Sequence, residues 1–262
     1  MKFDTTVCVL FYGDHPDLAR RVLTPLRALF REGVEFRVGC NEVSDRTLGV
    51  LAEFFGCDRM LSATGTTKFH FGDELDHTFY AHRPQIFKYP LMRRLFWDDD
   101  GVALPLHTKY VMWFDDDSYL TTNRPVDWLE EVEQFMKNCD LAGDLWFPKP
   151  GLSMNQCAWA ASRPWANGKQ VRTGHKPRFA TGGWWIARTE MLREYDWPDP
   201  DISHNGGDVM LGLLMELNGR RLAKFNHGVA INADAEGRNS RAKRRGYSGP
   251  PVGSGYRNEE AL

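Results

Sequence analysis

The sequence predicts an α/β protein with a single domain built on an open, doubly wound sheet. Three observations support this class. Strand-like apolar runs alternate with amphipathic helical segments, 262 residues are enough for one large core, and the apolar fraction of 42% with 26% charged residues is typical of soluble globular proteins. No apolar run approaches the roughly 18 residues of a membrane span, and no secretory leader precedes the first apolar run, so we expect a cytoplasmic protein.

The first hundred residues predict the order strand, helix, strand, helix, strand. Strands are expected at 6–11, at 35–38 and near 60–61, and helices at 18–30 and 45–54. The run at 6–11 is continuously apolar and β-branched, which indicates a strand buried on both faces in a parallel sheet. Ser44 is placed to cap the second helix. Residues 62–82 show no periodicity and are expected to form an irregular surface loop.

The remaining elements follow from the same patterns. A helix is expected from Pro84, with a bend at Pro90, followed by a strand at 110–114 and a helix that begins at Asn123 or Pro125. Residues 147–179 form a long irregular mixture, which is typical of a functional or mobile segment. Beyond it we expect a strand at 179–187, a helix from Thr189, a helix from Asp208 to the Asn218-Gly219 stop, and a strand at 222–225.

Charge is unevenly distributed. Residues 1–144 hold 16 Lys and Arg against 24 Asp and Glu, whereas residues 145–262 hold 17 against 11. The basic second half fits an anionic partner, although ordinary solvated faces give the same count. We expect a domain over 1–236, with a nucleotide-donor half at 1–120 and an acceptor half at 121–236, and a basic, loosely ordered tail at 237–262. The five scattered cysteines form no Cys-x-x-Cys pair, which indicates reduced thiols and no structural zinc.

Three consecutive carboxylates, Asp115, Asp116 and Asp117, follow the apolar run at 110–114. Adjacent anions repel one another, so they need solvent or a cation. A solvated turn is one interpretation. The other is a Mg2+ or Mn2+ site, because open α/β sheets bind ligands at the C-terminal ends of their strands and these cations combine one or two carboxylates with nucleotide phosphates.

Two Gly-Gly segments follow the triplet, and neither is a Walker loop or a spaced dinucleotide fingerprint. In order, the chain carries an aromatic strand leading into Asp-Asp-Asp-Ser-Tyr at 113–119, Thr-Gly-Gly-Trp at 181–184, and Gly-Asp-Val-Met-Leu-Gly at 207–212. Over about residues 105–232 this set resembles nucleotide-sugar glycosyltransferases of the GT-A fold, and more narrowly the fringe-like and β1,3-galactosyltransferase group. The resemblance implies a nucleotide-binding mixed sheet flanked by helices. One departure is Gly207, where that group usually has Glu.

The resemblance also implies roles for the acidic residues. Asp117 would bind the metal directly, Asp115 would reach the ribose or a metal-bound water, and Asp116 would support the site. His227 would be a third metal ligand, with His204 as its competitor and a surface role as the alternative. Asp208 would be the general base of an inverting reaction, and helix capping is its alternative.

Donor binding is expected at the first strands and at the first Gly-Gly segment. Tyr12 could stack on the base and Asp14 or Asn41 could bind the base or ribose, with core or turn roles as alternatives. Lys88 could face the diphosphate or ribose, or solvent. Gly182 and Gly183 would let the backbone approach the donor sugar, and Trp184 and Trp185 would offer stacking surfaces, one of them lying in the core because neighbouring strand residues face opposite ways.

The sequence therefore predicts a metal-dependent, inverting glycosyltransferase that moves a sugar from a nucleotide sugar, a UDP-sugar in the first instance, with Mn2+ or Mg2+. The acceptor is a glycan or glycolipid, or a hydroxymethylated base in DNA reached by base flipping. Two alternatives to a glycosyltransferase remain. The first is a metal-dependent nucleotidyltransferase, although the Gly-rich basic loop that such enzymes usually have near the N-terminus is absent. The second is a nucleotide-sugar-binding module without catalysis.

Overall fold

A computed structural model describes residues 3–32, 34–41, 43–56, 78–82, 88–97, 105–202 and 206–233. The helices in these ranges are α1 (Pro16–Arg31), α2 (Asp45–Phe55), α3 (Lys88–Trp97), α4 (Pro125–Met136), α5 (Met154–Ser162), the 3-10 helix η2 (Pro164–Ala166), α6 (Thr189–Glu194) and α7 (Gly207–Leu217). The strands are β1 (Thr5–Tyr12), β2 (Glu35–Asn41), β3 (Thr78–His82), β4 (Tyr110–Asp115), β5 (Tyr119–Leu120), β6 (Leu141–Trp146), β7 (Phe179–Arg188), β8 (Leu222–Lys224) and β9 (Val229–Ala230).

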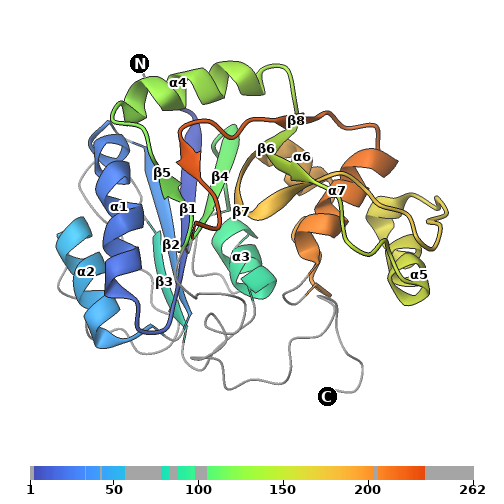
Figure 1. The fold of residues 1–262 in the computed structure, drawn as a ribbon, viewed down its shortest axis with the longest axis horizontal. Coiled ribbons are helices and arrows are strands. Elements are labelled where there is room, and N and C mark those ends of the chain that lie inside the picture. Colours follow the sequence, from blue (N-terminus) through green and yellow to red (C-terminus); the bar gives the residue numbers. More distant parts are fainter. Residues whose placement is uncertain are drawn as a thin grey trace.

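Seven of the described strands form one sheet in the order β3-β2-β1-β4-β7-β6-β8 (Figure 1). The first four run parallel to one another, whereas β7 runs antiparallel to both of its neighbours, β4 and β6. Strand β8 then adds parallel to β6. The short strands β5 and β9 pair separately. The sheet is therefore mixed, and its parallel half is built from the first strands of the chain, as the alternation of elements predicts.

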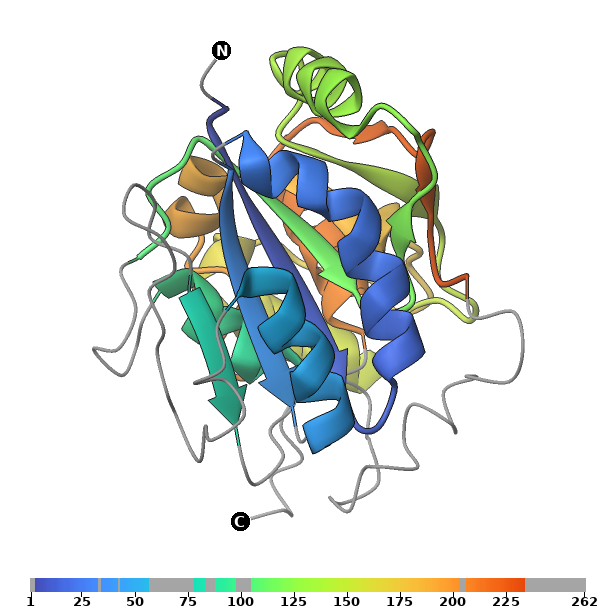
Figure 2. The ribbon, with the colours of Figure 1, turned by 90° about the vertical axis from the view of Figure 1, so that its left-hand side faces the viewer.

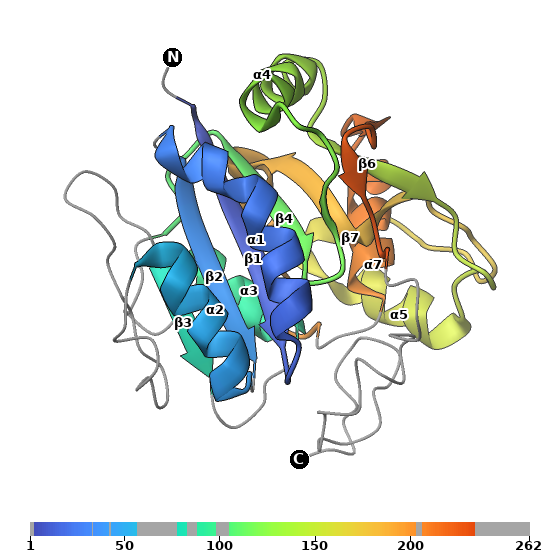
Figure 3. The same ribbon diagram turned by 60° about the vertical axis from the view of Figure 1, so that its left-hand side comes forward.

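Helices cover both faces of the sheet, with α1 and α2 on one face and α3 on the other (Figures 2 and 3). Side chains alternate between the two cores, so that Val7 and Val9 of β1 join the core under α1 whereas Cys8 and Leu10 join the core under α3. This alternation is why the strand at 6–11 is apolar at every position.

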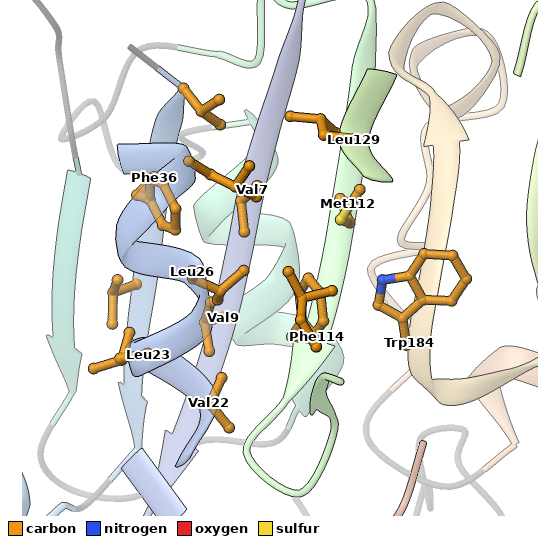
Figure 4. Close-up of a cluster of buried hydrophobic side chains, with 14 of the residues drawn as sticks. Val7, Val9, Val22, Leu23, Leu26, Phe36, Met112, Phe114, Leu129 and Trp184 are labelled. Carbon is orange, nitrogen blue, oxygen red and sulfur yellow. The ribbon is translucent and has the colours of Figure 1, made fainter. Parts of the chain in front are cut away.

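The core under α1 combines aliphatic and aromatic side chains (Figure 4). Val22, Leu23 and Leu26 of α1 are buried over the Val7 and Val9 side chains of β1. Their spacing matches the apolar stripe of an amphipathic helix, and burying each such side chain stabilises the fold by about 1.5–3 kcal/mol.

Most of the predicted elements are confirmed, including their end signals. Ser44 caps α2, where its hydroxyl accepts a hydrogen bond from the Thr47 backbone N–H at 3.2 Å. Helix α4 begins at Pro125. Helix α7 ends at Leu217, and Gly219 follows with a φ of +63°.

Three predictions about local structure were wrong, and three strands were missed. Strand β3 lies in the predicted loop at 62–82, and α5 with η2 lies in the irregular segment at 147–179. The strands that were not predicted are β5, β6 and β9. Pro90 falls in the first turn of α3, where its missing N–H costs no hydrogen bond, so it does not interrupt the helix. The strand near 60–61, the helix start at Pro84 and the tail at 237–262 lie outside the described residues.

Within the described ranges, no helix is both long enough and apolar enough to cross a lipid bilayer.

Candidate active site

The carboxyl ends of the parallel strands bring three predicted site residues to one edge of the sheet. In the registers of these strands, Tyr12 pairs with Asn41 at the ends of β1 and β2, and Asp115 at the end of β4 pairs with Leu10, two residues before Tyr12. Parallel strands must end at a common edge, so the residues that follow them share one surface. The acidic triplet therefore lies beside the end of β1.

Two donors among the described residues hold Asp115. Its Oδ2 accepts a hydrogen bond from Lys88 Nζ at 2.8 Å, and its Oδ1 accepts one from Trp113 Nε1 at 2.8 Å. The Lys88 ammonium also donates to the Gly182 carbonyl oxygen at 2.8 Å. Lys88 is buried at the start of α3, so the alternative of a solvated lysine is wrong. The cation joins helix α3, the triplet strand and the Gly-Gly strand at one point.

Asp208 lies next to this point at the second position of α7. A Cβ atom built on Gly182 would be 3.2 Å from Lys88 Nζ and 3.6 Å from Asp208 Oδ2, so a side chain at this position would crowd the Lys88 ammonium. The helix is capped by Gly206, which has a φ of +84°, and not by Asp208. Asp208 Oδ1 accepts a hydrogen bond from the Val209 N–H at 3.0 Å.

The pKa of Asp208 is raised above its ordinary value, chiefly because burial disfavours the charged form. The nearby Lys88 cation and hydrogen bonds from backbone N–H groups partly oppose this rise. Elevated carboxyl pKa values at the mouth of a sheet are typical of groups that exchange protons during a reaction.

Gly207 is a glycine for a steric reason. A Cβ at this position would lie 2.2 Å from Tyr89 Cζ, so the ring of Tyr89 occupies the space that a side chain would need. Burial, followed by the charges of Asp208 and Asp115, raises the pKa of the Tyr89 hydroxyl well above its ordinary value, and this hydroxyl therefore stays protonated. The glycine at position 207, where the resembling group usually has Glu, is therefore accompanied by a tyrosine beside Asp208.

The segment at 231–233 closes the other side of the triplet. The backbone N–H of Ala233 donates to the Asp117 carbonyl at 2.8 Å, and that of Asn232 donates to Ser118 Oγ at 3.0 Å. Gly183 lies underneath, because a Cβ there would be 2.4 Å from Asn232 Oδ1 and 2.7 Å from Ser118 Oγ. Both glycines of the first Gly-Gly segment therefore serve close packing at the site. Asp116 and Asp117 are buried beside this segment.

The structure does not bring His227 to the triplet. Its Nε2 lies 2.9 Å from Glu131 Oε1 on α4, and its ring packs on Phe225 at 4.1 Å between ring centroids. Ala233, whose N–H reaches the Asp117 carbonyl, follows His227 by six residues, about 20 Å along an extended chain. No group of three or more His, Cys, Asp or Glu side chains that could hold a metal is found in the described part of the chain. His204 lies outside that part.

The predicted stacking role of Trp184 is wrong. Both Trp184 and Trp185 are buried, Trp184 against Phe114 and Trp185 stacked on Trp113 with ring centroids 6.3 Å apart. Neighbouring strand positions face opposite cores, and both cores are covered by helices.

The other predicted donor-binding residues differ in their surroundings. Asp14 is half exposed, and its carboxylate accepts hydrogen bonds from Ser44 Oγ at 2.6 Å and from Arg46 at 3.2 Å, which together lower its pKa. It thereby supports the start of α2. Asn41 is buried at the end of β2, and Tyr12 packs at the margin of the core that contains Tyr89.

Three residues of the site were not predicted, namely Tyr89, Ser118 and Asn232. Tyr89 directly follows Lys88, and Ser118 directly follows the triplet, so proximity in sequence was the available indication. Asn232 is brought to the site by the pairing of β5 with β9. Each of these strands has only two residues, so their sequences do not predict that they pair.

Sequence comparisons identify no relatives, since no protein-family model and no curated protein matches the chain. Solved structures do resemble it. TarS from S. aureus superposes with a TM-score of 0.51 and 14% identity, over 87% of this chain and 35% of that one. The mannosyltransferase PcManGT from Pyrobaculum calidifontis, solved in complex with GDP-Man and Mn2+, superposes with a TM-score of 0.50 and 10% identity, over 87% of this chain and 56% of that one.

The fold is of the GT-A type. The predicted mixed sheet flanked by helices is thereby confirmed, whereas the narrower resemblance to the fringe-like group stays a prediction. The chain spans about a third of TarS and just over half of the mannosyltransferase.

Proposed function

We propose that this protein is a glycosyltransferase that moves a sugar from a nucleoside diphosphate sugar to an acceptor hydroxyl. The observation that carries the proposal is the junction of Lys88, Asp115, Gly182 and Asp208 at the carboxyl edge of a GT-A sheet. It places a buried cation and a carboxylate with a raised pKa where open α/β sheets bind nucleotides. The mannosyltransferase with a similar fold was solved with GDP-Man and Mn2+.

The donor set at the triplet fits a divalent cation. Asp116 and Asp117 offer only oxygen ligands, and Mg2+ or Mn2+ in nucleotide sites uses one or two carboxylates with the phosphates supplying the rest. We assign the direct contact to Asp117, with Asp116 beside it. Asp115 is held by Lys88 and Trp113 and would orient the donor. When bound, such a cation offsets the negative charge that develops on the departing diphosphate.

The transfer proposed here makes one bond and breaks one. The acceptor oxygen bonds to the anomeric carbon, the bond from that carbon to the diphosphate oxygen breaks, and the nucleoside diphosphate leaves with the electron pair. The acceptor hydroxyl proton passes to the Asp208 carboxylate, which must therefore be ionised at the start. Attack from the side opposite the leaving group inverts the anomeric configuration.

The remaining roles concern the donor and the acceptor. We assign Tyr12 and Asn41 to the base and ribose because they end β1 and β2 beside the triplet. A UDP-sugar is the first donor to test and GDP-mannose the second. We propose a glycan or glycolipid hydroxyl as the acceptor, with a hydroxymethylated DNA base as the competing candidate in the same assay.

Calorimetric titration of the full chain with UDP or GDP, with and without Mn2+, tests donor binding. We expect metal-dependent binding that Asp117→Ala abolishes, whereas Asp127→Ala, which removes an exposed aspartate in the first turn of α4, keeps it. A radiolabelled donor screen then identifies the acceptor. Metal-independent binding, or full turnover in Asp117→Ala, would remove the metal role, and release of pyrophosphate in place of a nucleoside diphosphate would show a nucleotidyltransferase.

A further inference from the structure

An extended pair of segments continues beyond the end of the β6-β7 hairpin. Trp146 pairs with Phe179 at the last position of the ladder, and the pairing continues as the Leu152 N–H donates to the His175 carbonyl at 2.8 Å and the Gly174 N–H donates to the Leu152 carbonyl at 2.7 Å. We refer to residues 146–154 and 172–179 as the projecting ribbon. Figure 1 shows this region with α5 at the right-hand edge of the molecule, on the side away from α1 and α2.

The projecting ribbon is strongly basic. Residues 147–180 contain six Lys and Arg and no Asp or Glu. Within this stretch Arg163 is neutralised by Asp199 and Asp201. Four cations of the projecting ribbon are exposed and form no ion pair with any described residue: Lys149, Arg172, Lys176 and Arg178. Uncompensated charge of one sign over a short surface attracts a partner of opposite charge.

The same ribbon carries the exposed large apolar side chains of the described chain. Trp146 is 53% exposed, Phe147 58% and Met154 71%. The Trp146 indole is held in place, because its Nε1 donates to Asp144 Oδ2 at 2.8 Å while Asp144 Oδ1 accepts from Asn226 Nδ2 at 2.8 Å. A tryptophan fixed by hydrogen bonds yet half exposed presents its ring to something outside the chain.

We propose that the projecting ribbon docks this protein on an anionic lipid membrane. Stable peripheral binding needs two contributions, apolar insertion and electrostatic attraction, and the ribbon supplies both within one surface. A nucleic acid would satisfy the cations equally well. It would leave Met154 uncovered, because this side chain, the most exposed of the three, has no ring face on which a base can stack.

Docking would hold the candidate active site close to the membrane surface. Trp146 is paired with Phe179, which lies three residues before Gly182 on the same strand, a separation of about 10 Å. The docking inference depends only on the surface of the ribbon. Docking would also bring the site to the glycolipid acceptor of the proposed function, and that consequence rests on the proposed function. Vesicle binding is therefore measured without donor or turnover, so that its failure and the failure of the proposed function are distinguishable.

Vesicle sedimentation of the full chain measures the electrostatic and the apolar contributions to membrane binding separately. We expect binding to mixed phosphatidylglycerol–phosphatidylcholine vesicles and much weaker binding to pure phosphatidylcholine. Lys149→Gln with Lys176→Gln should weaken binding about 30-fold, since each cation near an anionic surface contributes about fivefold in affinity. The matched control, Arg20→Gln with Arg27→Gln, removes two exposed cations from α1 and should leave binding unchanged.

A second variant tests the apolar contribution. Phe147→Ser with Met154→Ser should weaken the binding that persists at about 1 M salt, where charges are screened beyond about 3 Å. Circular dichroism verifies that each variant is folded. Equal losses in the ribbon and α1 variants, or a loss of double-stranded DNA binding in Lys149→Gln with Lys176→Gln without a loss of vesicle binding, would overturn the proposal, and the latter would assign the ribbon to nucleic acid.

Discussion

At the scale of single residues, the chemistry of the site depends on Lys88. Its ammonium lies 2.8 Å from an Asp115 oxygen and 2.8 Å from the Gly182 carbonyl, and its charge acts on Asp208. This one cation therefore has two roles, because it holds Asp115 through an ion pair and lowers the pKa of the buried Asp208 carboxyl. Replacing Lys88 should change the ionisation of Asp208.

Asp208→Asn should lower kcat by about 10²- to 10⁴-fold, the usual contribution of a general base. The amide keeps the size of the carboxylate and can still accept the Val209 hydrogen bond, so donor affinity should change little. Single-turnover kinetics and calorimetry measure the two quantities. Wild-type turnover in this variant would exclude Asp208 as the base.

The activity should have an acidic limb set by Asp208. Its raised pKa means that the ionised base is lost as pH falls through a value above that of an ordinary aspartate. Lys88 opposes the rise, so Lys88→Met should move this limb to higher pH. Since that variant leaves Asp115 buried without its cation, Lys88→Met with Asp115→Asn serves as a folded second variant. A limb at unchanged pH in both would contradict the coupling.

Gly207→Ala should destabilise the fold, because the new methyl group would overlap the Tyr89 ring, and overpacking of this kind costs about 1–3 kcal/mol. Urea unfolding measures the free energy of unfolding. Gly49→Ala, on α2 where no atom lies within 4 Å of the new Cβ, is the matched control and should be neutral or stabilising.

At the scale of elements, periodicity predicted the segments whose burial is one-sided or complete. Helix α1 and strand β1 are examples, since their apolar patterns follow directly from the core they cover. Strand β6 was not predicted because Gly and Asp, which occupy positions 143 and 144, disfavour strands. Its place in the sheet depends on pairing with β7 and β8. Helix α5 was not predicted because only Cys157 and Ala160 are buried along it, so its sequence contains no apolar stripe.

Ser44→Ala should lower the stability by about 1 kcal/mol, the usual cost of removing a helix N-cap. The hydroxyl both accepts from the Thr47 N–H and donates to Asp14, so its loss should also return the Asp14 pKa towards its ordinary value. Urea unfolding and carboxyl NMR titration measure these effects. Ser44→Thr keeps the hydroxyl and should retain both, and equal stability of the Ala variant would show that the cap is dispensable.

At the scale of the whole molecule, the site is assembled from five separate parts of the chain. Lys88, Asp115, Gly182 and Asp208 were each selected from local motifs or from the family resemblance, and the structure brings these four together. Local patterns could not predict which distant segment of the chain packs beside these four residues. Whether a histidine or the segment at 231–233 reaches the triplet is decided by the β5-β9 register, a long-range property.

A fragment of residues 1–120 should be insoluble and bind no nucleotide. It would contain the ends of β1, β2 and β4 but would lack β7, which hydrogen-bonds along the whole free side of β4, and Trp184, which packs on Phe114. Unpaired strand edges of this length promote aggregation. Sedimentation and titration with nucleotide test this, with the full chain as control, and a soluble, nucleotide-binding fragment would contradict it.

The position of β7 between β4 and β6 also has a consequence during synthesis. The residues of β7 that pair with β4 are 184–188, and Arg188 follows Asp115 by 73 residues. At about 5–20 residues per second the ribosome needs roughly 4–15 s to make the partner of β4 after β4 itself is complete. Throughout that interval the nascent sheet ends in an apolar strand with an unpaired edge. The growing chain is therefore a natural client for ribosome-associated chaperones, and its yield should depend on them more than the stability of the finished protein would suggest.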